Sequence, residues 1–354
     1  MRIKIACIAF MLLLLAGCGK DRQADEPVPS VAETELLLAY LEENGNLLNS
    51  EYIPALIDAD AVYQRLVAQN MHVVDLRPAE EYAVGHIAHS VNVPPENILH
   101  HFEQRIQPAS FEQVVLVCND AMLSSYVAAV LIFLGYDNVA ALRFGLSIWD
   151  EEIAQKHWLD VLSDHLHDKL ETTSNPKNPA GELPALATGQ TIPYHILRQR
   201  AEGLLNNHGE SAISISELME NPDKYYIINY WPEPLYHRGH LPGAIQYTPK
   251  ASLHSSAYLK TLPVDRPVVL YCFTGNHSAY AAAFLNLLGY EAYTMVYGAN
   301  SFIHTTIKET ERPGRWFTED RVLGLPLSGK DGETGHPPAA RQQQEEPVPV
   351  IGGC

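Results

Sequence analysis

The sequence repeats itself at a fixed offset of 154 residues, and this repeat constrains the fold more than any other feature. The equivalent pairs are Asp75 and Asn229, Tyr82 and Tyr236, Gly85 and Gly239, His86 and His240, Cys118 and Cys272, Ser124 and Ser278, and Gly135-Tyr136 and Gly289-Tyr290. So many equivalent residues at one constant offset do not arise by chance, so the chain is a duplicated domain. Its 354 residues are enough for two domains that each bury a core.

Both repeats alternate short apolar strands with helical segments, which predicts an α/β fold. The strand-like runs are 72–76, 114–117 and 139–142 in the first repeat, and 226–229, 268–271 and 292–296 in the second. This alternation favours a central, mostly parallel β-sheet flanked by helices in each domain. From composition we expect a signal at 1–17, a tether at 18–32, a first domain at 33–171, a Pro- and Asn-containing linker at 172–193, a second domain at 194–326 and a disordered tail at 327–354.

The N-terminus has the pattern of an export signal. Arg2 and Lys4 precede an apolar run over residues 5–16, which is too short for a permanent membrane-spanning helix. The ending Leu15-Ala16-Gly17-Cys18 resembles a bacterial lipobox, which implies cleavage before Cys18 and lipidation of its sulfur. Because Gly19 follows the cysteine, that resemblance favours the outer membrane of a Gram-negative bacterium. The alternative is a secreted protein with an incidental cysteine.

Charge and cysteine usage exclude several function classes. Loss of the signal with its two cations takes the formal charge from −18 to −20, which disfavours nucleic acid and leaves the acyl chains as the membrane attachment. Three thiols would remain, on Cys118, Cys272 and Cys354, without any Cys-x-x-Cys pair. We therefore expect no disulfide framework, no metal and no cofactor, and single reactive thiols instead.

Cys272 stands between an apolar strand and a helix. The run Pro267–Tyr271 precedes it, and residues 279–288 have a helical, apolar composition. A thiol at this place meets backbone N–H groups and the positive end of a helix dipole, which stabilise an anion. The predicted anion cradle consists of Phe273, Thr274, Gly275, Asn276, His277 and Ser278. Cys118 lies in the corresponding place of the first repeat.

Three motifs now point to one family. The run from Asp75 through Arg77, Glu81 and Tyr82 to Gly85-His86-Ile87 resembles the signature near the start of a rhodanese domain. The run Gly239–Ile245 is similar to its continuation, and Cys272-x-x-Gly275-x-His277-Ser278 resembles the active loop. Two such domains in tandem resemble thiosulfate or mercaptopyruvate sulfurtransferases over roughly residues 50–310.

The resemblance implies transfer of sulfane sulfur through a Cys272 persulfide, with a small sulfur-containing anion or a persulfide as donor. A periplasmic thiol protein or a reductase would be the acceptor. The family usually has Arg at the position of His277, so we expect a persulfide, polysulfide or related chalcogen donor more than thiosulfate. The alternative is that His277 is a solvated loop residue.

The two repeats depart from the family pattern in different ways. Asn229 and Trp231 replace the Asp75 and Arg77 of the first repeat, which need not affect catalysis. The first repeat has good framework residues but carries Asp120, Ala121 and Leu123 in its loop. A carboxylate beside the thiol disfavours the thiolate, so Cys118, with Arg77, is predicted to be a weak or relic secondary site; a sulfur-holding role stays open.

The same residues are compatible with other functions. The Cys272 loop also resembles the Cys-x5-Arg loop of phosphatases, but Ser278 stands in place of the Arg. Cys354 is a candidate sulfur acceptor or regulatory disulfide partner of Cys272, or an incidental thiol. The leading hypothesis is a sulfurtransferase. The alternatives are a carrier of persulfide, polysulfide or selenium or tellurium species for a partner reductase, and a structural lipoprotein with inactive domains.

Overall fold

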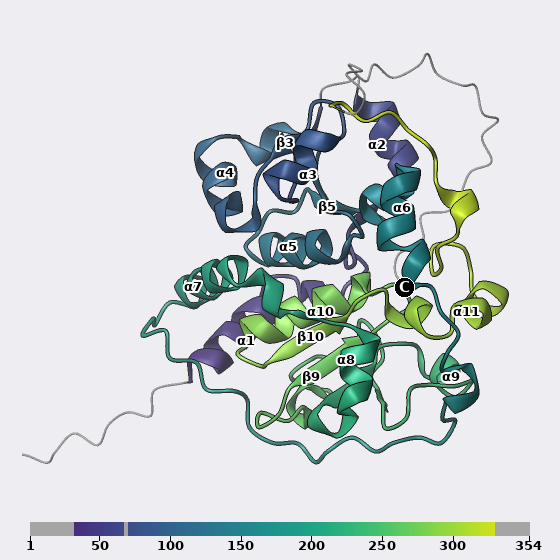
Figure 1. Cartoon of the computed structure of the whole chain (residues 1–354). Helices are drawn as coiled ribbons and strands as arrows, with labels where there is room; N and C mark the ends of the chain where they lie inside the picture. The colour runs from purple at the N-terminus through teal and green to yellow at the C-terminus, as the bar shows by residue number, and fades with distance from the viewer. Residues whose placement is uncertain (1–31, 67–69, 330–354) are drawn as a thin grey trace, which may run out of the picture. The chain divides into compact units, whose positions relative to one another are not determined.

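Figure 1 shows a computed structural model that describes residues 32–66 and 70–329. The described residues belong to one compact unit that begins at Ala32. The predicted signal, the predicted lipidation site Cys18 and the terminal thiol Cys354 lie outside the described residues.

Two five-stranded sheets of the same topology form the framework. The first has the order β1-β5-β4-β2-β3 and the second the order β6-β10-β9-β7-β8, and every strand pair in both is parallel. The strands are β1 (Leu56–Ile57), β2 (Met71–Asp75), β3 (Val91–Asn92), β4 (Gln113–Val117), β5 (Val139–Leu142), β6 (Ala212–Ile213), β7 (Tyr226–Asn229), β8 (Ile245–Gln246), β9 (Val268–Tyr271) and β10 (Ala292–Met295). The duplicated α/β fold is therefore confirmed.

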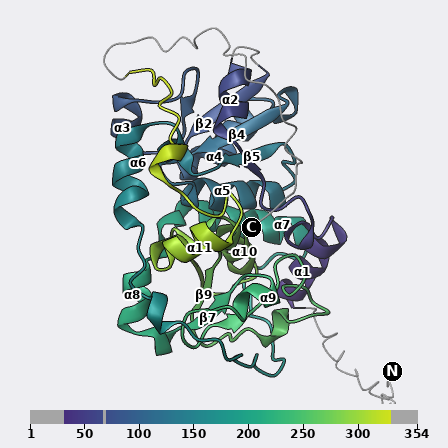
Figure 2. The same cartoon turned by 90° about the vertical axis from the view of Figure 1, so that its right-hand side faces the viewer.

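The helices cover the sheets, as parallel connections require. They are α1 (Glu33–Glu43), α2 (Ala59–Arg65), α3 (Ala79–Val84), α4 (Ile98–Gln104), α5 (Met122–Phe133), α6 (Glu151–His157), α7 (Pro193–Asn206), α8 (Ile215–Glu220), α9 (Glu233–Tyr236), α10 (Asn276–Leu287) and α11 (His304–Thr310). All twelve residues of α10 are buried, as are nearly all of α5. Such helices need neighbours on every side, and α5 and α10 pack directly against each other (Figure 1, Figure 2).

A segment after the first domain crosses to the second sheet; we call residues 163–171 the first strap. Ser163 donates its N–H to the carbonyl of Asn300 at 3.2 Å, and Glu171 forms an antiparallel bridge with His240. Leu166 is buried in the second domain's core. The sequence predicts this segment at the end of the first domain, but its contacts are with the second.

A segment after α11 returns to the first domain; we call residues 315–328 the second strap (Figure 1). Ser328 forms an antiparallel bridge with His86, and Phe317 is buried in the first domain's core. Leu323 and Leu325 donate N–H groups to the carbonyls of Ile148 and Trp149. Since His86 and His240 are equivalent in the repeat, the exchange of straps is reciprocal.

Candidate functional site

Cys272 follows β9, the central strand of the second sheet, at its carboxyl end. Its side chain is 0% exposed, yet it does not face hydrocarbon alone. The N–H of Gly275 donates a hydrogen bond to Sγ at 3.2 Å, and the hydroxyl of Ser278 lies 3.7 Å from Sγ. The thiol thus lies at the start of α10, where the Gly275 N–H, the Ser278 hydroxyl and the helix dipole favour negative charge.

The backbone around Cys272 requires glycine on both sides. Gly275 has φ +86° and precedes the first residue of α10. A Cβ at Gly275 would lie 2.5 Å from Sδ of Met122, and one at Gly298 would lie 2.3 Å from the carbonyl oxygen of Cys272. That carbonyl accepts the N–H of Ala299 at 3.0 Å. The 3-10 turn η11 (Gly298–Ser301) therefore fixes the loop from its other side.

Aromatic side chains stack beside the thiol. Phe273 lies parallel to Trp231, with ring centroids 4.5 Å apart and an interplanar angle of 5°. The guanidinium of Arg315, on the second strap, lies 4.4 Å from the Phe273 ring centroid and pairs with Glu311. Sequence reasoning missed Arg315, because it lies outside the repeated motifs and reaches the loop only through the strap.

His277 is not a solvated loop residue, so that alternative is wrong. The side chain is 0% exposed, and Asn276, His277 and Ser278 form the first turn of α10. The His277 ring packs edge-on to the Tyr230 ring, with ring centroids 5.0 Å apart. Neither nitrogen of the His277 ring has a hydrogen-bond partner among the described residues. Burial, and secondarily the charge of Lys250, lowers the pKa of His277 to about 3. The imidazole is therefore neutral at physiological pH and supplies no cation.

Cys118 occupies the equivalent place in the first domain but in a different electrostatic setting. Its Sγ lies 3.5 Å from Oδ1 of Asp120, to which it donates, and accepts the N–H of Ser124 at 3.4 Å. Burial first, and the Asp120 carboxylate second, raise the pKa of Cys118 to about 12. The group stays a thiol at neutral pH, which supports the predicted weakness of this site.

Arg77 serves the framework of the first domain. Its guanidinium bonds both carboxylate oxygens of Asp75, at 2.7 Å to Oδ2, and donates to the carbonyl of Gly85 at 2.6 Å. In the second domain Asn229 instead donates to the hydroxyl of Tyr271 at 2.9 Å. A neutral hydrogen bond thus replaces a buried ion pair at the same place in the repeat.

The two cysteine loops meet each other. The side-chain N–H of Asn276 donates to the carbonyl of Ala121 and to the hydroxyl of Ser125, each at 3.2 Å. The hydroxyl of Tyr297 lies 3.3 Å from Oδ2 of Asp120. Each loop is therefore held partly by side chains of the other domain.

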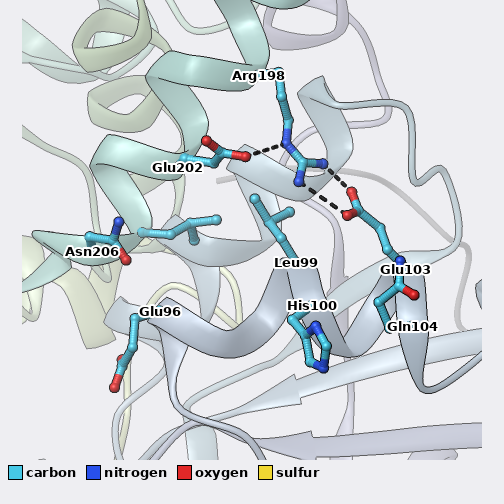
Figure 3. Close-up of a pocket in the computed structure, with 9 residues that line it drawn as sticks. Glu96, Leu99, His100, Glu103, Gln104, Arg198, Glu202 and Asn206 are labelled. Atoms are coloured by element: carbon cyan, nitrogen blue, oxygen red, sulfur yellow. Dashed lines mark hydrogen bonds and ion pairs between the residues drawn. The ribbon is translucent and has the colours of Figure 1, made fainter.

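A surface groove of about 560 Å³ lies elsewhere, between α4 and α7 (Figure 3). Its lining is Glu96, Leu99, His100, Glu103, Gln104, Arg198, Glu202, Leu205 and Asn206. Arg198 pairs there with Glu103 and Glu202. The groove contains no cysteine, so it is separate from both candidate thiols.

No three His, Cys, Asp or Glu side chains within residues 32–66 and 70–329 come together as a metal site. None of the helices in those same segments combines the length and apolar character needed to cross a bilayer.

Comparison with known families settles the identity of the fold. The model of the rhodanese-like domain matches residues 58–152 and 211–304, which together make up more than half of the chain. The chain belongs to the rhodanese-like domain family. Both matched segments contain one cysteine loop, so the repeat seen in the sequence is a repeat of this domain.

Individual relatives match at low identity. The thiosulfate sulfurtransferase GlpE of Shewanella oneidensis is 29% identical over 96 residues, which are 27% of this chain and 91% of that protein. The GlpE of Pseudoalteromonas translucida is 26% identical over 89 residues, 25% of this chain and 81% of the relative. A solved thiosulfate sulfurtransferase from Pseudomonas aeruginosa is 20% identical, with a TM-score of 0.29, over 74% of this chain and 46% of that one.

Proposed function

We propose that this rhodanese-like protein is a sulfurtransferase that moves sulfane sulfur through a persulfide on Cys272. The observation that carries the proposal is the Gly275 N–H directed at Sγ of Cys272 at the start of α10. The curated relatives named above are sulfurtransferases, which supports the same reaction class. Two-step transfer through a covalent intermediate suits an activated cysteine.

The proposed reaction has two balanced steps. The Cys272 thiolate attacks the outer sulfur of the donor, the donor S–S bond breaks, and the leaving group departs with the electron pair. An acceptor thiolate then attacks the outer sulfur of the Cys272 persulfide, forms the acceptor persulfide and restores the Cys272 thiolate. Because Cys272 is 0% exposed, a donor reaches it only when the residues around it move.

We propose a persulfide or polysulfide as the donor in preference to thiosulfate. His277 is buried and neutral, so the position where the family usually has Arg offers no charge to a sulfonate group. Arg315 is a nearby cation, but it lies over the Phe273 ring and is paired with Glu311.

To test this proposal, the protein is incubated with polysulfide and separately with thiosulfate. Mass spectrometry then measures the sulfur adducts on Cys272 and Cys118. We expect a sulfur adduct on Cys272 with polysulfide, and turnover that is lost in Cys272→Ser and kept in Cys118→Ser. The reason is that Sγ of Cys272 accepts the Gly275 N–H, whereas burial and the Asp120 carboxylate raise the pKa of Cys118 to about 12. Turnover that survives Cys272→Ser would refute the assignment, and faster turnover with thiosulfate would refute the donor.

A carrier of persulfide, polysulfide or related selenium or tellurium species is the second candidate. Complete burial of Cys272 favours it, since a buried persulfide is protected from solvent thiols. A carrier would take up one sulfur on Cys272 and release it only to a specific protein acceptor such as a reductase. Catalytic turnover with small thiols in the same assay would exclude this alternative.

We also propose that the protein is attached to the outer membrane through a lipidated Cys18. The support is the sequence pattern around Leu15–Cys18. The mass of the mature N-terminal peptide tests it. A peptide that begins at Cys18 with acyl chains is expected, and an unmodified cysteine would refute the proposal.

A further inference from the structure

The Cys118 loop retains a strained shape although its thiol is not ionised. Ala121 has φ +75° and ψ 0°, the left-handed region that disfavours residues with a Cβ. The equivalent residue in the second domain is Gly275, with φ +86°. The first domain thus keeps the same loop backbone as the second, although Ala121 disfavours that conformation. Burial and Asp120 keep Cys118 protonated. Strain of this kind persists only where surrounding contacts hold it.

The strained shape presents hydrogen-bond acceptors to the second domain. The carbonyl of Ala121 and the hydroxyl of Ser125 both accept from Nδ2 of Asn276, each at 3.2 Å. Asn276 is 1% exposed and is the first residue of α10. It directly follows Gly275, whose N–H donates to Sγ of Cys272.

Two more contacts reinforce this junction. Met122 lies over Gly275, since a Cβ there would come within 2.5 Å of Sδ. On the other side, Tyr297 donates its hydroxyl to Asp120 at 3.3 Å, and the Tyr297 N–H would lie 3.1 Å from that same Cβ position. Residues of the first loop therefore contact both the Gly275 turn and the segment that lies behind it.

We infer that the first domain's loop is a positioning device for Cys272, and that Asn276 is the positioning residue through which it acts. The carbonyl of Ala121 and the hydroxyl of Ser125 fix Asn276, and Asn276 fixes the Gly275 N–H at the Cys272 sulfur. This inference deepens the proposed function. Only its consequence for sulfur turnover rests on that function. Stabilisation of the thiolate is measurable without any sulfur donor.

The experiment compares Asn276→Ala with Asn286→Ala in the full chain. Asn286 is a matched control on the same helix: it is buried and also bonds to the first domain, through the hydroxyl of Tyr126 at 3.1 Å, but far along α10 from the loop. The readout is the pH dependence of iodoacetamide alkylation, followed on the Cys272 peptide by mass spectrometry.

We expect Asn276→Ala to move the alkylation profile of Cys272 toward higher pH and to lower its rate at neutral pH about threefold to tenfold, because a hydrogen bond to the thiolate loses its alignment. Asn286→Ala should leave the profile in place, even where it lowers stability. An unchanged profile for Asn276→Ala would overturn the inference, and so would an equal shift for Asn286→Ala.

A second variant, Ser125→Ala, tests the inference even if Asn276→Ala does not fold. Ser125→Ala removes one of the two acceptors of Asn276 and should shift the profile in the same direction by a smaller amount. If Asn276→Ala does not fold, an unchanged profile for Ser125→Ala overturns the inference. The alkylation rate can be measured without any sulfur transfer. If the unmodified protein proves to lack the proposed activity, this test therefore still decides whether Asn276 positions the loop.

Discussion

At the scale of single residues, the charge states of the side chains in the two cysteine loops depend on their surroundings. Cys118 and Cys272 are both buried at strand ends, but Cys118 faces the Asp120 carboxylate, whereas Cys272 faces the Gly275 N–H. His277 stands where the family pattern has a permanent cation, and burial makes it neutral. Burial first, and neighbouring charges second, therefore set the charge states of Cys118 and His277.

His277 should make the protein sensitive to acid. Its pKa is about 3 in the folded chain against an ordinary value of 6.5, so between these values the unfolded chain binds more protons and stability falls as the pH falls. Full stability is present above about pH 7, and about 2 kcal/mol of this contribution is lost at pH 5. His277→Leu should therefore gain about 2 kcal/mol relative to the unmodified protein between pH 7.5 and pH 5.

Urea unfolding at both pH values measures this difference. His195→Leu, at an exposed position of α7, is the control and should show no relative gain at low pH. A constant difference between His277→Leu and the unmodified protein would show that the imidazole is not held neutral.

At the scale of elements, the start of α10 depends on a contact from another helix. Gly275 turns the chain from β9 into α10, and Met122, the first residue of α5, occupies the space where a side chain would be. Two helix starts from different domains therefore determine one turn. This explains why a glycine is needed there beyond its favourable φ.

Gly275→Ala should lower the free energy of unfolding by about 2 kcal/mol or more, because the added Cβ meets both a left-handed backbone and Sδ of Met122. Gly203→Ala, at a helical position where the added Cβ meets nothing within 4 Å beyond the backbone of its own helix, is the control. It should be neutral or stabilising by up to about 1 kcal/mol.

The contact itself is isolated by a double-mutant cycle measured by urea unfolding. Adding Met122→Ala to Gly275→Ala should recover part of the loss, so the two changes are less than additive. Strict additivity would mean that Met122 does not restrict the turn.

At the scale of the whole molecule, the straps bind each domain to the other. The first strap ends in a bridge from Glu171 to His240, and the second ends in a bridge from Ser328 to His86. Because each domain's core includes a side chain from the strap that follows the other, the two domains complete each other's packing. Each domain on its own would expose apolar surface that the intact chain buries.

Phe317→Ala should destabilise the protein by about 3–5 kcal/mol, although it lies outside both matched domain segments. Phe317 is 0% exposed and packs 5.2 Å from the rings of both Phe144 and Trp158. Urea unfolding measures the loss. Leu323→Ala on the same strap removes a side chain that is 40% exposed and should lower stability by less than about 1 kcal/mol. Equal effects of the two substitutions would contradict the role of the strap.

The fold and the position of the proposed nucleophile could be predicted from the chain alone. The period-154 repeat and the alternation of strands and helices predicted two parallel sheets, because such patterns record local backbone preference and burial. The place of Cys272 between β9 and α10 followed from the same local order. The start of α10 at Asn276 was less exact, since the residues of its first turn read equally well as loop.

Sequence alone determined the duplicated architecture and the two candidate thiols, since the first follows from the 154-residue repeat and the second from the residues that flank each cysteine. Only tertiary structure decided that His277 is neutral, that Arg315 reaches Phe273, and that Asn276 binds the Cys118 loop. These properties arise between residues far apart in the chain. Burial and hydrogen bonding across such separations depend on how the two domains pack, and local pattern does not encode that packing.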